Sequence, residues 1–119
     1  MKWKVAFHPE FLEEFLTFPE PLQDNLFAKS ILLEVYGPQL GRPHADVLQG
    51  SSFSNLKELR LELKGAQWRV AYAFDPGRTA ILLAAGNKTG QHQIRFYKKL
   101  IQKANRRFRN HLKNSSPKK

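Results

Sequence analysis

The stretch LKELRLELKGAQWRVAYAFDPGRTAILLAAGNKTG, residues 56–90, decides the fold. It contains three runs with the alternation of β-strands, residues 56–64, 67–74 and 79–85. The segments between them, residues 65–66 and 75–78, are rich in turn-forming residues and short enough for tight turns. The sequence therefore predicts an antiparallel meander of three strands.

The predicted register of this meander brings two arginines onto one face. A turn centred on residues 65–66 sets Arg60 opposite Ala71, and the second turn sets Arg69 opposite Ala84. The opposite face is apolar and is expected to carry Leu59, Leu61, Leu63, Val70, Tyr72, Phe74, Ile81 and Leu83.

Two interpretations of the arginine face remain open. An alanine floor beneath Arg60 and Arg69 leaves room for a planar or anionic ligand, and the fork of an arginine suits a phosphate. Alternatively, Glu58 and Glu62 hold the arginines in an exposed ion-pair face, or the last helix covers the alanines. Spacing alone favours this structural alternative, because surface ion pairs on sheets are common.

The segments before the meander predict one strand, two helices and a loop. Residues 2–7 alternate in hydropathy, and Pro9 suits the first turn of a helix that follows them. A second helix is expected between Pro19 and Gly37, so that the two helices form a hairpin. Residues 39–55 predict a long loop, and such loops are often functional.

The segment after the meander predicts a basic closing helix over about residues 93–112. The element order is then β-α-α-β-β-β-α, which favours an α+β fold with the helical hairpin on one face of an antiparallel sheet. We expect a single domain over residues 1–119, with a flexible basic tail over residues 114–119. The apolar face of the closing helix is expected to consist of Ile94, Tyr97, Leu100, Ile101, Ala104, Phe108 and Leu112.

The charge of the chain is strongly asymmetric. The 119 residues carry a formal net charge of +10. Residues 1–75 hold all ten acids and eight bases, whereas residues 76–119 hold twelve bases and no acid. A cationic surface of this kind indicates a polyanionic partner such as a nucleic acid.

Composition excludes several other kinds of site. The chain has no cysteine, which excludes disulfides, thiolate metal sites and a cysteine nucleophile. The four histidines are dispersed without metal-ligand spacing, so we expect neither a metal nor another cofactor. No apolar run is long enough to span a bilayer and no signal peptide is visible, so we expect a cytoplasmic protein with no membrane partner.

Two segments near the end of the meander contain candidate RNA-binding groups. The GNKTG segment, residues 86–90, combines glycines with Lys88, which can meet a phosphate as a point charge, although the segment can also be merely a turn. In the closing helix, Arg95, Lys98 and Lys99 are interleaved with aromatic residues. This mixture is typical of RNA-binding surfaces, and also of a helix that packs its aromatics and solvates its lysines.

Together these segments resemble a known family. The ordered motifs ELR, WRV, FDP, GNKTG and RFY, followed by His111-Leu112, are similar to those of the phage-derived, HigB-like branch of the RelE/ParE toxin superfamily. The resemblance covers about residues 56–112 and implies a RelE-like fold. It also implies a toxin paired with a helix-turn-helix, HigA-like antitoxin, which we expect to cover the basic face. Many members of the superfamily cleave mRNA in the ribosomal A site.

The sequence departs from the pattern of this family at three positions. Asn87 stands where the branch commonly has Asp, and Gln102 and Asn105 replace a usual Pro and Asp in the last helix. We expect these departures to affect the docking of a partner or the reaction rate more than the fold.

The resemblance implies metal-free cleavage of mRNA, in which a ribose 2′-hydroxyl attacks the adjacent phosphorus and leaves a 2′,3′-cyclic phosphate and a 5′-hydroxyl. Arg60 and Arg69 are then expected to stabilise the phosphorane. Lys88 is assigned to the phosphate and to proton donation, and Tyr97 to base stacking or proton transfer. His92 is the candidate general base, the alternative being an exposed loop histidine.

The function expected from the sequence is that of a type II toxin, a ribosome-dependent mRNA endoribonuclease that inhibits translation. One alternative is a non-catalytic, ParE-like toxin that inhibits DNA gyrase, and another is a degenerate toxin that only binds RNA or its antitoxin. The fold cannot separate these functions. The convergence of Arg60, Arg69 and Lys88 favours RNA chemistry.

Overall fold

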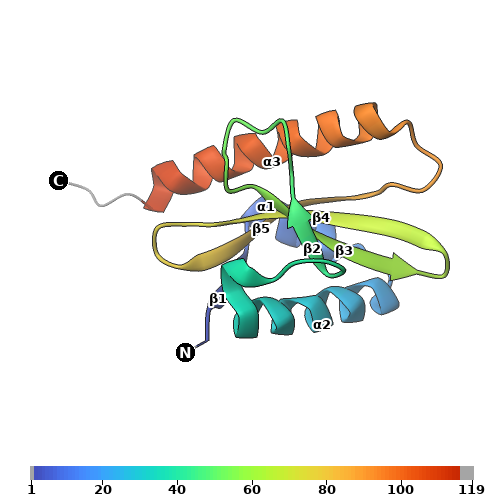
Figure 1. The fold of residues 1–119 in the computed structure, drawn as a ribbon, viewed down its shortest axis with the longest axis horizontal. Coiled ribbons are helices and arrows are strands. Elements are labelled where there is room, and N and C mark those ends of the chain that lie inside the picture. Colours follow the sequence, from blue (N-terminus) through green and yellow to red (C-terminus); the bar gives the residue numbers. More distant parts are fainter. Residues whose placement is uncertain (1, 116–119) are drawn as a thin grey trace.

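The computed structural model describes residues 2–115. The elements in chain order are β1 (Lys4–Phe7), α1 (Pro9–Phe15), α2 (Glu20–Tyr36), the 3-10 turn η1 (Gly37–Gln39), β2 (Ala45–Val47), β3 (Lys57–Leu63), β4 (Ala66–Phe74), β5 (Thr79–Asn87) and α3 (Gln93–Ser115). The five strands form one sheet in the order β1-β5-β4-β3-β2. Helix α2 lies on one side of this sheet and α3 on the other (Figure 1).

The expected α+β class and the antiparallel meander β3-β4-β5 are confirmed, with one strand more than predicted. The additional strand, β2, lies within the segment predicted as a long loop and pairs antiparallel with β3. The sequence did not reveal this strand, because three residues are too few to show the alternation of apolar and polar residues that marks a β-strand. At the other end of the chain, α3 includes the first two residues of the expected tail, and residues 116–119 of that tail lie outside the described residues.

The predicted register between β3 and β4 is wrong. Arg60 pairs with Arg69 and not with Ala71. The turn is formed by Lys64 and Gly65, whose φ angles of 49° and 83° are both positive, as a two-residue type I′ turn requires. The prediction failed because it placed this turn one residue later in the chain.

The predicted register between β4 and β5 is also wrong. Arg69 lies opposite Gly86, because β5 continues beyond Ala85 to Asn87. Between Ala71 and Tyr72 the ladder shifts and leaves one extra residue in β5. A shift of this kind exchanges the faces of the strand. On the turn side of the shift Ile81 pairs with Ala73 and shares its face under α3. Leu83 is the extra residue and lies under α3 as well, although both residues were expected on the leucine-rich face.

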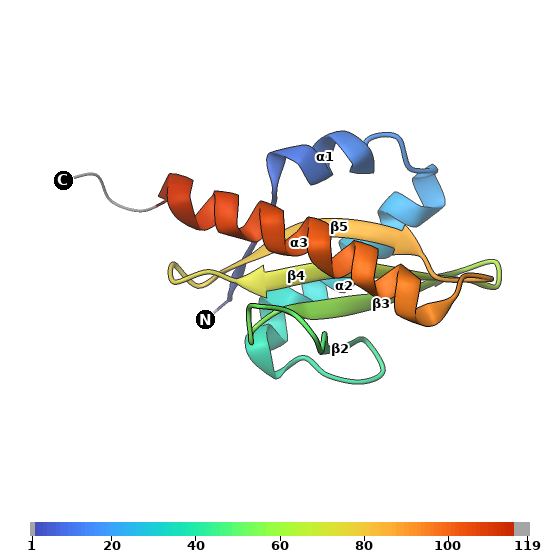
Figure 2. The same cartoon turned by 90° about the horizontal axis from the view of Figure 1, so that it is seen from above.

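The two sides of the sheet have separate apolar cores. On the side of α1 and α2, the buried residues include Phe11, Phe15, Leu22, Leu26, Leu33, Leu59, Leu61, Val70, Tyr72 and Leu82. On the side of α3, they include Leu56, Ala71, Ala73, Ile81, Leu83, Ala84, Phe96, Leu100, Ala104 and Phe108. Figure 2 shows α3 crossing the sheet, with α1 beside β5 and away from β2.

The position of α3 decides between the two interpretations of the alanine floor. Ala71, Ala73 and Ala84 are fully buried beneath it, so the interpretation with an open alanine surface is wrong and the alternative in which the last helix covers the alanines is confirmed. The apolar face of α3 also differs at its first turn. Ile94 is 74% exposed, whereas Phe96, which the sequence analysis did not assign to this face, is buried.

No helix within residues 2–115 is long and apolar enough to cross a membrane.

Candidate functional site

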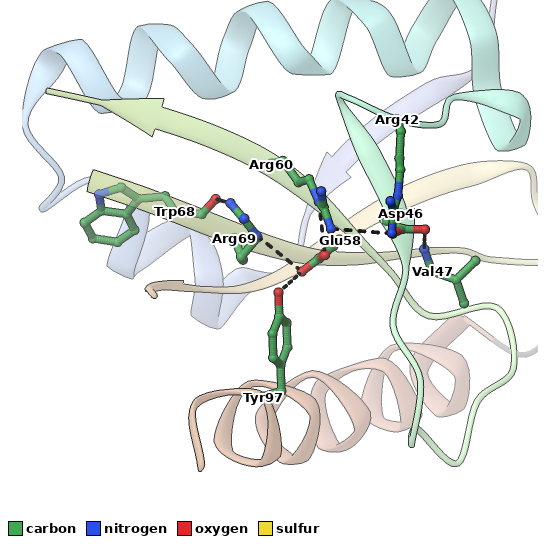
Figure 3. Close-up of polar contacts among 8 residues, drawn as sticks. All are labelled: Arg42, Asp46, Val47, Glu58, Arg60, Trp68, Arg69 and Tyr97. Carbon is green, nitrogen blue, oxygen red and sulfur yellow. Dashed lines mark hydrogen bonds and ion pairs between the residues drawn. The ribbon is translucent and has the colours of Figure 1, made fainter. Parts of the chain in front are cut away.

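Five charged side chains of alternating sign form a row beside the buried alanines (Figure 3). The row runs in the order Arg42, Asp46, Arg60, Glu58 and Arg69, and we call it the charge ladder. Asp46 Oδ2 lies 2.8 Å from Arg42 and 3.5 Å from Arg60. The Glu58 carboxylate lies 3.4 Å from Arg60 Nε and 3.7 Å from Arg69 Nε. Each acid therefore lies between two arginines.

The strand register explains why the ladder forms. Arg60 and Arg69 are cross-strand partners, and two like charges in that position repel each other. Glu58 lies two residues before Arg60 on β3 and so shares its face of the sheet. The side chain of Glu58 is only 4% exposed, and its carboxylate compensates the charge of both arginines.

Asp46 at the outer end of the ladder is held in its charged form. The backbone N–H of Val47 donates to Asp46 Oδ1 at 2.8 Å, and Arg42 Nε donates to Oδ2 at 2.9 Å. These two hydrogen bonds, the backbone one first, hold the pKa of Asp46 below its ordinary value. Asp46 is therefore an anion at neutral pH and forms an ion pair with Arg60 as well as with Arg42.

Tyr97 on α3 completes the site from the other layer of the molecule. Its hydroxyl donates to Glu58 Oε1 at 2.8 Å (Figure 3). Burial raises the pKa of Tyr97, and the hydrogen bond to Glu58 adds to this effect while Arg69 opposes it. The Tyr97 hydroxyl consequently remains protonated at neutral pH and is a hydrogen-bond donor.

Close packing between α3 and β5 sets the position of Tyr97. The ring of Phe96 lies directly against Gly86, where an added Cβ atom would be 2.8 Å from a ring carbon. Only glycine leaves space for this contact. Because Phe96 precedes Tyr97 in the same helical turn, the contact with Gly86 fixes the start of α3 and directs Tyr97 toward Glu58.

A groove with a volume of about 700 Å³ opens along this row. Glu58, Arg60 and Tyr97 line it together with Asp46, and Lys98 and Asn105 of α3 line it as well. Arg69 does not belong to this lining: its side chain is 7% exposed, lies behind Glu58 and donates to the Trp68 carbonyl oxygen at 3.0 Å. The groove thus presents one arginine, one buried carboxylate and one phenol to a ligand.

The structure brings together most of the catalytic residues expected from the sequence. Arg60, Arg69 and Tyr97 meet at Glu58, and the Nζ atom of Lys88 lies 5.7 Å from the centre of the Tyr97 ring. His92 lies apart from this cluster. It is exposed, and its backbone carbonyl accepts the N–H of Phe96 at the start of α3.

The three residues expected to bind RNA along α3 are all exposed. Lys98 lines the groove, whereas Lys99 borders a smaller cavity beside Gly86. Arg95 lies in the same first turns of the helix. Because all three side chains are exposed, water can solvate their charges. Of the three, only Lys98 lies on the wall of the groove.

Two members of the site were not predicted as functional residues. Glu58 was considered only as an ion-pair partner, although it alternates with Arg60 on the same strand and this signal was visible. Asp46 lies in β2, whose three residues show no strand pattern. Within residues 2–115, no group of three His, Cys, Asp or Glu side chains could hold a metal ion.

Comparison with known sequences gives consistent matches. A family model described as "Phage derived protein Gp49-like" matches residues 13–109. Two relatives from Mycobacterium tuberculosis, HigB2 and HigB3, carry toxin names. HigB2 is 44% identical over 88 residues, which is 73% of this chain but only 43% of HigB2. HigB3 is 47% identical over 81 residues, which is 68% of each protein.

Comparison with solved structures gives the same fold. A doubly substituted Escherichia coli toxin RelE in the free state matches with a TM-score of 0.62 and 14% identity, covering 90% of this chain and 98% of RelE. A chain of the archaeal RelE-RelB complex from Pyrococcus horikoshii matches with a TM-score of 0.55 and 20% identity, covering 76% of this chain and 100% of the other. At these identities the likeness concerns the fold alone.

Proposed function

The chain belongs to the phage-derived Gp49-like family, within the HigB-like branch of the RelE toxin superfamily, and from this premise we propose that it is a ribosome-dependent mRNA endoribonuclease. One observation carries the proposal: the nearly buried carboxylate of Glu58 lies between Arg60 and the Tyr97 hydroxyl on the wall of a groove. This arrangement combines a base, a cation and a proton donor. RNA transesterification needs these three kinds of group.

Arg60 is the group that we assign to the scissile phosphate. Its side chain is 30% exposed and lines the groove, so a phosphate can reach it. The attack of the 2′-hydroxyl places additional negative charge on the phosphate oxygens, and a fixed guanidinium stabilises that charge. Arg69 acts through Glu58, from which its Nε lies 3.7 Å, and is a positioning residue.

Glu58 is the group that we assign to the 2′-hydroxyl, in place of His92. An ionised carboxylate offers about four acceptor positions, and Tyr97 and Arg60 each take one of them. A free position remains on the groove for the proton of the attacking hydroxyl. His92 is exposed and does not line the groove, so its geometry offers less support for the same role.

Tyr97 completes the movement of protons. The bond from O2′ to phosphorus forms while the bond from phosphorus to O5′ breaks, and the Tyr97 hydroxyl proton passes to O5′. Glu58, which has received the O2′ proton, returns it to Tyr97 along the 2.8 Å hydrogen bond. The ammonium of Lys88 lies 5.7 Å from the Tyr97 ring and stabilises the transient phenolate. The site is thereby restored without a net change in protons.

Partners follow from the same proposal. The substrate is mRNA in the ribosome, and the exposed cations of α3, Arg95, Lys98 and Lys99, face a polyanion. The cognate partner is a helix-turn-helix, HigA-like antitoxin that covers this basic face and so prevents access to the groove. The RelE-RelB complex among the structural neighbours supports a toxin bound to an antitoxin.

The deciding experiment is primer extension on a defined mRNA in a cell-free translation reaction. Wild-type protein is expected to produce cuts that require ribosomes. Arg60→Ala removes the phosphate contact and is expected to lower the rate by about 10²–10³-fold. Tyr97→Phe removes a single oxygen atom and is expected to lower it by about 10²-fold. Arg106→Ala provides a matched control, because Arg106 is an exposed arginine of α3 outside the groove.

The outcomes separate the functions that share this fold. Cuts that persist unchanged in Arg60→Ala and Tyr97→Phe would remove these residues from the mechanism. Intact mRNA together with continuing translation would overturn the endoribonuclease. A supercoiling assay with purified DNA gyrase would then test the ParE-like alternative.

A further inference from the structure

We infer that the groove selects the nucleobase as well as the phosphate, and that Asn105 makes it favour a base with a keto oxygen, guanine before uracil. This inference rests on the proposed function, because it requires an RNA strand in the groove. Asn105 lines the same groove as Glu58 and Arg60 and is half-buried on α3.

A short chain of hydrogen bonds fixes the orientation of the Asn105 amide. The backbone N–H of Phe53 donates to Ser51 Oγ at 3.0 Å. The Ser51 hydroxyl in turn donates its single proton to Asn105 Oδ1 at 2.6 Å. In the opposite orientation, the NH₂ group of Asn105 would face Ser51 Oγ. The proton of the Ser51 hydroxyl would then lose its acceptor on Asn105. Ser51 is therefore a positioning residue for Asn105.

This orientation leaves the amide donor of Asn105 unpaired. Its carbonyl oxygen accepts from Ser51 in one of its two acceptor positions, and Nδ2 makes no hydrogen bond to any of residues 2–115. The neighbouring groove residue Lys98 carries an ammonium group, which also only donates. Two of the polar residues that α3 contributes to the groove, Asn105 and Lys98, thus offer donors, one of them a fixed amide and the other a cation.

The Asn105 donor distinguishes bases with a keto oxygen from bases with an amino group. Guanine presents two adjacent acceptors, O6 and N7, on its Hoogsteen edge, and uracil presents O4. Adenine and cytosine place an amino group where guanine and uracil have the keto oxygen, so the Asn105 donor would face a donor there, and adenine offers it N7 alone. When a base fills the groove, a donor that meets another donor loses its hydrogen bond to water without gaining a new one. The groove accordingly favours keto bases over amino bases.

The test measures binding without cleavage. Four fluorescein-labelled RNA oligomers differ in one base and carry 2′-O-methyl groups, which removes the attacking hydroxyl. Fluorescence anisotropy with the full chain is expected to show that guanine binds about tenfold tighter than adenine at that position. Asn105→Asp replaces the donor by an acceptor and is expected to reverse this order, while the melting temperature reports that the variant is folded.

Two further variants isolate the orientation of the amide. Gln102→Glu introduces the same charge in the same groove on an exposed residue, and it is expected to weaken all four oligomers without changing their order. Ser51→Ala releases the Asn105 carbonyl and is expected to reduce the preference for guanine, with adenine binding more tightly than before. A merely structural role of Ser51 would not change the ratio between the bases.

The results separate this inference from the proposed function. Equal binding of all four oligomers by a protein that cleaves mRNA in translation would overturn the base preference alone. Failure to bind any oligomer, together with intact mRNA, would overturn the function on which the inference rests. A guanine preference that persists unchanged in Asn105→Asp would assign the selection to another residue and would also overturn the inference.

Discussion

The two sides of the sheet differ in what their side chains do. The side of α1 and α2 is covered by large apolar residues such as Phe11, Leu33 and Tyr72, which are fully buried. On the side of α3, the sheet contributes small residues such as Ala71 and Ala84. The charge ladder lies beside these apolar residues on the same side. One side therefore serves stability alone, whereas the other divides its area between stability and chemistry.

The difference shows how a small domain can hold buried charge. The alanines let α3 approach the sheet closely, so Phe96 and Leu100 pack there and hold the wall of the groove in place. The cost of burying Glu58 is offset by its arginines and by Tyr97. The large core on the opposite side supplies the stability that the charged region does not.

The largest expected effect separates stability from chemistry. Phe11→Ala empties the centre of the core beneath α1 and is expected to lower the free energy of unfolding by about 3–5 kcal/mol. Cleavage by the folded fraction at 25 °C is expected to stay unchanged, because Phe11 lies on the side of the sheet opposite the groove. Urea denaturation and the primer-extension assay measure the two properties.

Leu16→Ala is the matched control for this comparison, because Leu16 follows α1 and is 66% exposed. Its free energy of unfolding is expected to change by less than about 0.5 kcal/mol. A loss of cleavage in folded Phe11→Ala would show that the two sides of the sheet are coupled.

The second prediction concerns the link between the two sides. Arg107 of α3 is buried, and its Nη1 atom donates to Glu14 of α1 at 3.0 Å and to the Leu83 carbonyl at 2.8 Å. Arg107→Met retains most of the volume but leaves both acceptors unpaired, and it is expected to lower the free energy of unfolding by about 2–3 kcal/mol. Thermal unfolding measures the change.

The neighbouring residue provides the control. Arg106 makes a similar pair with Glu10, but its side chain is 59% exposed. Arg106→Met is therefore expected to cost less than about 1 kcal/mol. Equal losses for the two variants would contradict the importance of burial for this link.

The sequence predicted the meander well because its signal is local. Leu59 and Leu61 alternate with Arg60 and Glu62, and this alternation both identifies β3 and assigns its faces. The register was not predictable in the same way. It depends on Lys64 adopting a positive φ, which is uncommon for a lysine, and on a ladder shift beside Ala71 that has no visible sequence pattern.

The sequence predicted the cations of the candidate site but not the carboxylate of Glu58 at its centre. Arg60 and Arg69 were chosen from their types and their strands, and the structure brings them together. Glu58 gains its role from Tyr97, which lies 39 residues further along the chain and reaches it only when α3 packs on the sheet. A contact between distant segments of this kind cannot be derived from strand alternation.

The third prediction tests the contact between Gly86 and Phe96, which positions Tyr97 at the groove. Gly86→Ala places a methyl group about 2.8 Å from the Phe96 ring and is expected to lower the free energy of unfolding by about 1–2 kcal/mol. Because α3 must shift, the contact between Tyr97 and Glu58 is expected to lengthen. Cleavage should then fall more than the fraction of folded protein does.

Gly41→Ala is the control for the same substitution. Gly41 has no positive φ, and the nearest atom to its added Cβ is 3.9 Å away, so this variant is expected to match wild type in both assays. Full cleavage by Gly86→Ala would mean that the start of α3 does not need this close contact.

The smallest expected effect is a dependence on pH that arises outside the groove. His8 is buried beside α1, and its Nδ1 atom accepts the N–H of Glu10 at 3.1 Å. Burial lowers the pKa of His8 below its ordinary value of 6.5; Arg107 and His111 act in the same direction, whereas Glu10 and the side chain of Asn110 oppose it. The folded state therefore favours neutral His8. Its contribution to stability is complete above pH 6.5 and is lost as the pH falls through the lower folded pKa.

The melting temperature is consequently expected to decline once the pH falls below about 6.5, whereas the carboxylates with lowered pKa, such as Glu14, act only below about 4.5. His8→Asn retains an acceptor at the start of α1 and cannot titrate, so its melting temperature is expected to stay level between pH 7 and pH 5.5. An equal decline in both proteins would assign the effect to another group. A level profile for the variant would place this acid sensitivity at the α1 edge of the molecule, away from the charge ladder.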